Sequence, residues 1–304
     1  MDTSDLAKRM KDYESTSKTR LMKRCPVMIR IDGKAFHSFT KGFKRPFDEV
    51  LIKSMQETTK YLCENIQGCV LGYTQSDEIT LVLVDYKKLN TSPYFDYEIQ
   101  KMCSIIASMT TMAFNSIFTN HIYTIMTNLH YGSQWDYDYL CQEYGFSKED
   151  FKANSEFFNK HWTFYQKVKG TAMFDARVFN IPKEEVTNCL YWRQLDASRN
   201  SIQMVGQANF SHKELQNKSC NMIQDMLMTQ KGINWNDLPT YQKRGSCVIR
   251  EEYWVDKDGK EFPSILVYQG LGDDAIKRSR WIIDTEIPIF KGEGRDYIEK
   301  LINF

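Results

Sequence analysis

The order of the apolar segments between residues 27 and 179 constrains the fold more than any other feature of this sequence. Short runs rich in β-branched residues alternate with longer segments whose apolar residues recur at helical spacing, in the order β-α-β-β-α-β. The strands are expected at residues 27–31, 69–73, 78–84 and 172–179, and the helices at residues 47–65 and 97–118. This order is typical of the ferredoxin-like split βαβ fold, so we predict an α+β domain built on an antiparallel sheet.

Strand pairing in such a fold brings acidic residues together. A right-handed crossover makes the first two strands parallel, and the third strand fills the gap between them in the antiparallel direction. Asp32, at the end of the first strand, then lies beside Asp77 and Glu78, at the start of the third. Neighbouring carboxylates repel each other unless a cation lies between them. Because Mg²⁺ prefers oxygen ligands, the pattern favours a magnesium site that also binds phosphate.

The residues after Asp32 suit a phosphate-binding turn. Gly33 has no side chain to block a ligand, and the backbone N–H groups of residues 33–37 can bind a triphosphate. Three cationic residues are expected to neutralise the phosphates, namely Lys34, Lys44 and Arg45. The simpler alternative is that Asp32-Gly33 only forms a turn, as this pair commonly does.

The remaining segments define the expected domain organisation. A charged helix is expected over residues 4–24, whereas residues 119–170 show no clear pattern and are treated as an insertion. After residue 182 helices are expected from 184 to 194, from 211 to 231 and from 275 onward, with a hairpin pairing residues 248–250 and 265–267. We therefore expect a first domain over residues 1–182 and a C-terminal helical and β-hairpin extension over residues 183–304.

Composition limits the possible classes of function. Lys and Arg total 40 and Asp and Glu total 39, which excludes a general polycation but allows an RNA partner contacted by one face. The eight cysteines form no C-x-x-C pair, so a structural zinc site is not expected. The chain begins without a signal-peptide pattern, and no continuous apolar run approaches the roughly 20 residues that span a bilayer. We expect a cytoplasmic protein that does not contact membranes.

Five motifs together carry a family resemblance. In chain order they are Arg30–Phe39, Gly72–Glu78, Phe174–Val178, Tyr191–Gln194 and Leu238–Gly245. This set resembles the tRNA(His) guanylyltransferase family of 3′→5′ nucleotide polymerases. The resemblance implies that the βαββαβ core is a polymerase-type palm and that residues 1–182 form the catalytic domain.

The resemblance also implies a site. Asp32, the Gly33 carbonyl and Asp77 are expected to hold two Mg²⁺ ions with Glu78 beside them, so Asp32, Asp77 and Glu78 are the expected catalytic residues. Nucleotide contacts are expected from Asp32, Gly33, Lys34, Ala35, Phe36, His37, Lys44, Arg45, Ser76 and Asp77. Family members activate the 5′ end of tRNA, using ATP when that end is a monophosphate. The 3′-hydroxyl of GTP then attacks the activated phosphate. The family tends to form tetramers, so the expected partners are tRNA, ATP, GTP and further copies of the chain.

One motif departs from the eukaryotic branch of the family. That branch carries a His-Ile-Asn-Asn-Leu-Tyr-Asn block, whereas this chain has Ser198–Met204, in which only Asn200 matches in register. The departure favours the guanylyltransferase-like branch, which repairs 5′-truncated tRNAs by templated addition in preference to adding a single G.

Five further cations and one asparagine are candidates for tRNA or phosphate contact. The full set of candidates is Lys101, Arg177, Arg193, Asn200, Lys243 and Arg244. Guanidinium groups bind phosphate through two parallel hydrogen bonds, which favours the arginines. The alternatives are a solvated helix face for Lys101 and an intramolecular ion pair for Arg177 or Arg193.

Two other functions use the same fold. A nucleotide cyclase-like palm enzyme has the same pair of carboxylates, but residues 174–178 and 191–194 fit the tRNA family better. A non-catalytic RNA-binding module displays aromatic residues on its sheet, whereas the first and third strands here offer Val, Ile and Leu.

Overall fold

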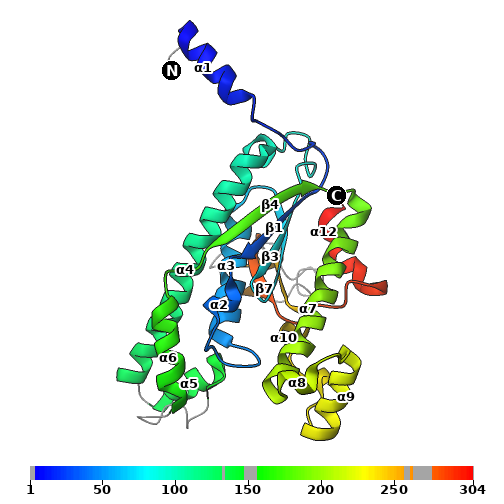
Figure 1. Ribbon diagram of the computed structural model, residues 1–304. Helices are drawn as coiled ribbons and strands as arrows, with labels where there is room; N and C mark the ends of the chain where they lie inside the picture. Colours follow the sequence, from blue (N-terminus) through cyan, green and yellow to red (C-terminus); the bar gives the residue numbers. More distant parts are fainter. Residues whose placement is uncertain (1–3, 132–133, 147–155, 257–260, 263–275, 304) are drawn as a thin grey trace.

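The computed structural model describes residues 4–131, 134–146, 156–256, 261–262 and 276–303 (Figure 1). Its strands are β1 (Val27–Gly33), β2 (Cys69–Gln75), β3 (Glu78–Leu83), β4 (Phe174–Asn180), β5 (Ser246–Val255), β6 (Glu261–Phe262) and β7 (Ile276–Asp284). The α-helices are α1 (Asp5–Ser15), α2 (Phe36–Phe39), α3 (Glu49–Asn65), α4 (Ile99–Tyr131), α5 (Gln134–Tyr144), α6 (Glu156–Val168), α7 (Val186–Asn209), α8 (His212–Leu215), α9 (Cys220–Lys231), α10 (Thr240–Arg244) and α12 (Asp296–Ile302). Short 3₁₀ turns lie at Tyr94–Tyr97, Lys183–Glu185, Trp235–Asp237 and Gly292–Arg295.

The described strands form one antiparallel sheet in the order β4-β1-β3-β2-β5-β6, and β7 also pairs with β5. The first four strands have the predicted ferredoxin-like order, with β3 between the parallel strands β1 and β2. The α+β prediction is therefore confirmed. Since β5 pairs with β2, the sheet also runs across the boundary expected at residue 182. The division of the chain into two regions at that residue stays a prediction.

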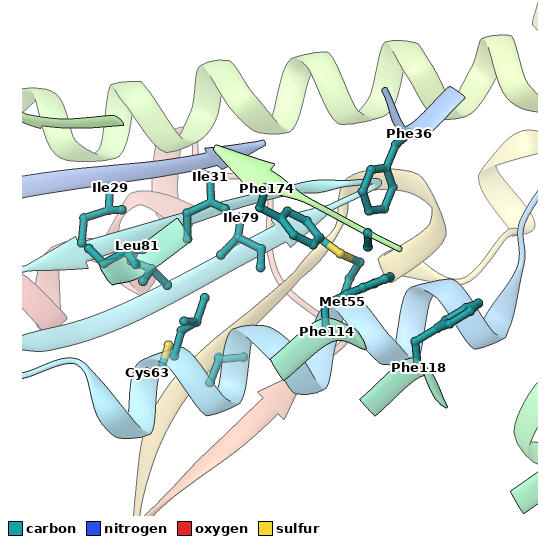
Figure 2. Close-up of a cluster of buried hydrophobic side chains, with 14 of the residues drawn as sticks. Ile29, Ile31, Phe36, Met55, Cys63, Ile79, Leu81, Phe114, Phe118 and Phe174 are labelled. Carbon is teal, nitrogen blue, oxygen red and sulfur yellow. The ribbon is translucent and has the colours of Figure 1, made fainter. Parts of the chain in front are cut away.

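Helices α3 and α4 cover one face of the sheet. Ile29, Ile31, Ile79 and Leu81 project from the central strands towards this side, where they are buried together with Met55 of α3 (Figure 2). At the end nearest α2, rings from three segments close the core: Phe36, Phe114, Phe118 and Phe174. Alternate strand residues point to opposite faces, so this pattern fixes which residues the other face presents.

Helices α7 and α12 cover part of the opposite face. Met28 and Val82 of the sheet are buried there against Leu190 of α7 and Ile298 of α12. Figure 1 shows α7 and α4 on opposite sides of the strands. Asp32 and Glu78 occupy paired positions of β1 and β3, in phase with Met28 and Val82, so both belong to the α7 side.

The segment without a clear sequence pattern is helical where it is described. Helix α4 continues to Tyr131 instead of ending near residue 118, because no Pro, Gly or charged cap interrupts it. Helices α5 and α6 follow, and α6 packs its Tyr165 ring against Phe43 and Phe118.

Helix α4 is the one described helix that is long and apolar enough to cross a bilayer, judged by length and composition alone. The sequence analysis found no continuous apolar run here, because Ser, Thr and Asn interrupt the apolar residues of α4. The helix nevertheless qualifies by mean hydropathy, since Ile, Met, Phe and Ala predominate and charged residues are few. A single helix of this kind is weak evidence for a membrane contact. Phe114 and Phe118 of α4 are fully buried, as in the core helix of a globular domain.

Three other helix predictions were wrong in part. The N-terminal helix ends at Ser15 and does not reach residue 24. At this end the hydroxyl groups of Ser15 and Thr16 donate hydrogen bonds to nearby backbone carbonyls. The helix expected over 211–231 divides into α8 and α9, since Asn217 adopts φ +61° and Ser219 caps a new helix. The helix expected from Ala275 is instead strand β7 from Ile276. The expected strand at 265–267 lies outside the described residues.

Candidate active site

The ends of β1 and β3 bring the predicted acids together. Asp32 pairs in register with Glu78, and the Gly33 N–H donates a 3.1 Å hydrogen bond to the Asp77 carbonyl. On its other side β1 pairs with β4, which places Asp175 opposite Asp32. The predicted meeting of these strand ends is therefore confirmed.

Burial and, after it, repulsion between the acids disfavour the ionised forms of Asp32 and Asp77. Burial, followed by the charges of Glu78 and Asp175, raises the pKa of Asp32. Burial is also the largest cause that raises the pKa of Asp77, and the charge of Asp32 adds to it, while a hydrogen bond from Ser76 lowers it. A cation bound between two such carboxylates would stabilise both charges.

The donor set at the strand ends fits a hard cation. Asp32 and Asp77 supply carboxylate oxygens. Gly33, the last residue of β1, directly follows Asp32 and donates its N–H to the Asp77 carbonyl. No group of three or more His, Cys, Asp or Glu side chains within the described ranges is arranged to hold a metal ion. A protein site with few carboxylates suits Mg²⁺, which keeps its remaining positions for water and substrate phosphates.

A close approach of two residues explains Gly33. A Cβ atom at this position would lie 2.3 Å from the ring of Phe36, which is buried between Phe114 and Phe174. Only glycine therefore lets the chain turn here into α2. The turn also uses Ala35 at φ +55°.

A cavity of about 550 Å³ opens beside the strand ends. Eight of the ten predicted nucleotide contacts line it, namely Gly33, Ala35, Phe36, His37, Lys44, Arg45, Ser76 and Asp77. Asp32 and Lys34 do not line it. Sequence analysis missed Met204 and Gln207, which line the cavity from the far half of α7. No local motif marks them, because only the packing of α7 brings them here.

Two further cavities adjoin this one. One of about 480 Å³ shares Arg45 and Gln207 with it and extends towards Phe210 and Lys218. The other, of about 80 Å³, shares Asp48 and Met204 and contains the candidate Asn200. The nucleotide-sized cavity thus has neighbouring cavities along α7.

The loop between α2 and α3 is fastened to α6 through Asp48. The buried Asp48 carboxylate accepts hydrogen bonds from the Tyr165 hydroxyl at 2.6 Å, the Lys44 N–H at 3.0 Å and the Leu51 N–H at 3.1 Å. Burial raises the pKa of Asp48, and the hydrogen bond from Tyr165 counteracts this shift. His161 of α6 also contacts the Gly42 carbonyl, with 2.6 Å between Nδ1 and the oxygen. Sequence analysis missed Asp48, although an Asp before an apolar helical stripe is an N-cap signal.

Glu78 is bound by two arginines. Its carboxylate pairs with Arg193 at 2.6 Å and with Arg30 at 3.3 Å. Arg193 is buried and also pairs with Asp196 at 2.8 Å. For Arg193 the structure therefore shows the intramolecular ion pair that the sequence left open. The role of Glu78 as a catalytic residue stays a prediction.

The other candidate contacts are dispersed. Lys101 lies over the Phe95 ring at 4.6 Å, and Arg177 is exposed on β4 with Asp175 at 3.4 Å. Lys243 and Arg244 lie on α10, where Lys243 donates to the Asn236 carbonyl and the Arg244 carbonyl accepts from Tyr73. Neither Lys101 nor the α10 pair lines the nucleotide-sized cavity.

Comparisons with known proteins agree with the motifs. The family model described as tRNAHis guanylyltransferase matches residues 7–182. The chain is similar to a bacterial tRNA(His) guanylyltransferase-like protein solved in complex with ATP, at 37% identity and a TM-score of 0.70 over 98% of this chain and 99% of that one. A second bacterial guanylyltransferase-like structure, in complex with GTP, matches at 34% identity and a TM-score of 0.66 over 99% and 100%.

A curated relative extends the comparison to eukaryotes. The tRNA(His) guanylyltransferase of Saccharomyces cerevisiae is 24% identical over 76% of this chain and 85% of its own length. The two bacterial structures are more similar to this chain than the yeast enzyme is. Both are named guanylyltransferase-like proteins, the branch that the Ser198–Met204 departure favours. The chain therefore belongs to the tRNAHis guanylyltransferase family and is a nucleotidyltransferase of that type.

Proposed function

We propose that this protein adds nucleotides to the 5′ end of tRNA in the 3′→5′ direction, with repair of 5′-truncated tRNA as its main reaction. The observation that carries the proposal is the convergence of Asp32 and Asp77 beside a nucleotide-sized cavity lined by His37, Lys44 and Arg45. The solved relatives in complex with ATP and GTP support both nucleotides as substrates. The Ser198–Met204 departure supports repair over single G addition.

The triphosphate is expected to lie in the cavity of about 550 Å³ beside the strand ends, which is called the triphosphate cavity below. Lys44 and Arg45 neutralise its charge from the α2–α3 loop, while His37 and Ser76 contribute polar contacts. Asp32 and Asp77, with the Gly33 carbonyl, would hold two Mg²⁺ ions. When bound, these ions neutralise phosphate charge and polarise the reacting oxygens.

The chain's own residues contribute positioning. The 3′-hydroxyl of the incoming nucleotide attacks the activated 5′ phosphate of the tRNA. A new P–O bond forms, and the bond to the leaving AMP or pyrophosphate breaks. The adjoining cavity towards Phe210 and Lys218 offers polar space for a substrate longer than one nucleotide.

A direct assay tests the proposal. The purified protein is incubated with Mg²⁺, ATP and the four NTPs on a 5′-truncated tRNA and, separately, on full-length tRNA(His). We expect extension and pyrophosphate release on the truncated tRNA. Asp32→Asn and Asp77→Asn should abolish extension, whereas the matched control Asp12→Asn, exposed on α1, should retain it. Absence of extension on both RNAs would refute the proposal.

The assembly is part of the same proposal. We expect a homotetramer, with a mass by light scattering of about four times the 35.8 kDa of one chain. A monomer in solution would contradict this part while leaving the proposed reaction open to the assay above.

A further inference from the structure

An exposed tryptophan lies on the sheet face that carries Asp32. The Trp192 side chain of α7 is 53% exposed, and its ring centroid is 5.4 Å from the Arg30 guanidinium. Arg30 precedes Asp32 by two residues on β1, so both project from the same face of the sheet. Trp192 therefore contacts a β1 residue that lies two positions before Asp32 of the predicted metal site, yet it does not line the triphosphate cavity.

A charged network fixes the indole in place. The Arg193 guanidinium lies 4.6 Å from the Trp192 ring centroid, in addition to the contact from Arg30. Both arginines pair with the same Glu78 carboxylate. Because the Arg193 side chain is buried, the ring rests on a rigid support, and an exposed aromatic ring held in this way is organised before any ligand arrives.

The surroundings of the ring suit a nucleotide. Leu195, three residues further on α7, is 51% exposed and extends the apolar surface. Arg177, which pairs in register with Arg30, is exposed on the neighbouring strand and can reach a phosphate. A flat ring beside a cation is the arrangement on which unpaired bases stack, and stacking accepts any base.

We propose that Trp192 is a stacking platform for a nucleobase at the reacting end of the substrate, outside the triphosphate cavity. The inference rests on the proposed function and extends it to a site with its own ligand. The base comes from the 5′-terminal nucleotide of the RNA or from the incoming NTP, since both present the same aromatic face. A sequence-tolerant platform suits repair, where the terminal base differs between tRNAs.

Two substitutions separate stacking from packing. Trp192→Phe retains an aromatic face, whereas Trp192→Leu retains apolar bulk without one. We expect Trp192→Leu to raise the KM of the stacked substrate about tenfold and Trp192→Phe to stay within about threefold of the unaltered protein. The KM for ATP in 5′ activation should not change in either variant, because Trp192 lies outside that cavity.

The matched control is Trp254→Leu. Trp254 lies on β5 with Lys277 6.0 Å from its ring, so it offers a comparable cation contact on a strand that carries none of the predicted acids. A rise in the KM of RNA with Trp192→Leu, absent with Trp254→Leu, supports the proposal and assigns the base to RNA. A rise confined to the incoming NTP supports it and assigns the base to the nucleotide.

Other outcomes overturn the proposal. Unchanged KM values in Trp192→Leu, or equal losses in the Leu and Phe variants, would show that no base stacks on this ring. Binding of a fluorescent single-stranded RNA, followed by anisotropy, gives a readout without catalysis. If the unaltered protein extends no RNA, the proposed function fails. In that case, equal RNA affinity of the unaltered and Trp192→Leu proteins overturns the platform as well.

Discussion

The Tyr165 hydroxyl donates a 2.6 Å hydrogen bond to the buried carboxylate of Asp48. Through Asp48 it restrains the loop that carries Lys44 and Arg45 into the triphosphate cavity. Removing the hydroxyl with Tyr165→Phe should weaken ATP binding about tenfold, since hydrogen bonds to charged groups contribute about 1.5–3 kcal/mol. Isothermal titration calorimetry with ATP measures this directly.

Tyr144→Phe is the control for that loss. The Tyr144 hydroxyl is also buried, and its partner, Nδ1 of His121 at 2.7 Å, belongs to α4 and not to the loop. Both variants should melt at lower temperature, but only Tyr165→Phe should change ATP affinity. Equal affinities in the two variants would show that the contact is merely structural.

The pKa of Asp48 predicts a pH-dependent effect of Asp48→Asn. Burial raises the folded-state pKa above the ordinary value of 3.8, so the ionised carboxylate lowers stability at neutral pH. Asn keeps an oxygen acceptor without this charge. Relative to the unaltered protein, Asp48→Asn should therefore be more favourable at pH 7 than at pH 3.5, where Asp48 is mostly protonated in both folded and unfolded chains.

Urea unfolding at the two pH values checks the Asp48 prediction. The difference in free energy of unfolding between variant and unaltered protein should move in favour of Asn as the pH rises. A difference that is the same at both pH values, or one that moves the other way, would contradict the assigned direction of the shift.

The Arg193–Glu78 pair predicts strong non-additivity. Arg193→Met leaves the Glu78 carboxylate with the ion pair to Arg30 and the hydrogen bond from Gln75, and breaking a buried pair costs about 3–5 kcal/mol. The double variant with Glu78→Gln should recover much of this loss, because it removes the uncompensated charge. Thermal melts of the two single variants and the double variant form the cycle, and purely additive losses would argue against the pair.

Gly33→Ala should disrupt the site by steric conflict. The new Cβ would lie 2.3 Å from the Phe36 ring, which is held by Phe114 and Phe174 and cannot move aside freely. Overpacking of this kind costs roughly 1–3 kcal/mol and should also displace the turn that lines the cavity. A fall in melting temperature together with weakened ATP binding is expected, and an unchanged melting curve would show that the ring can yield.

Magnesium should stabilise the folded protein through the two aspartates. A ligand that binds only the folded state adds about 2.7 kcal/mol at 100 times its Kd. We expect Mg²⁺ to raise the melting temperature of the unaltered protein and EDTA to reverse the rise. Asp77→Asn should show a much smaller response, whereas an equal response would place the ion elsewhere.

Local patterns in the sequence predicted the arrangement of β1 to β4, because the spacing of apolar residues determines which segments form strands and helices and which face of each is buried. Alternating apolar residues and the crossover rule were enough to bring Asp32 to Asp77. Side chains that meet only through packing had no such signal. Met204 and Gln207 reach the cavity because of the position of α7, and Tyr165 reaches Asp48 because α6 folds back onto the α2–α3 loop.

The end of the chain was the least predictable region. The acids Asp273 and Asp274 precede the segment from residue 275 and suit a helix start, yet Ile276–Asp284 forms β7, because β5 offers an edge with which its backbone can pair. Such tertiary pairing overrides local preference. The buried ion pair of Arg193 lay beyond the sequence for the same reason, since its partner is over 100 residues away.

The pairing of β5 with β2 makes the β2–β3 hairpin, which carries Asp77, depend on residues that are synthesised more than 150 positions after it. Until β5 has been synthesised, one edge of β2 has unpaired backbone N–H and C=O groups with which another polypeptide can pair. A polypeptide that stops before Ser246 would therefore carry both aspartates on a sheet that is prone to aggregate, and only a chain that includes β5 covers that edge.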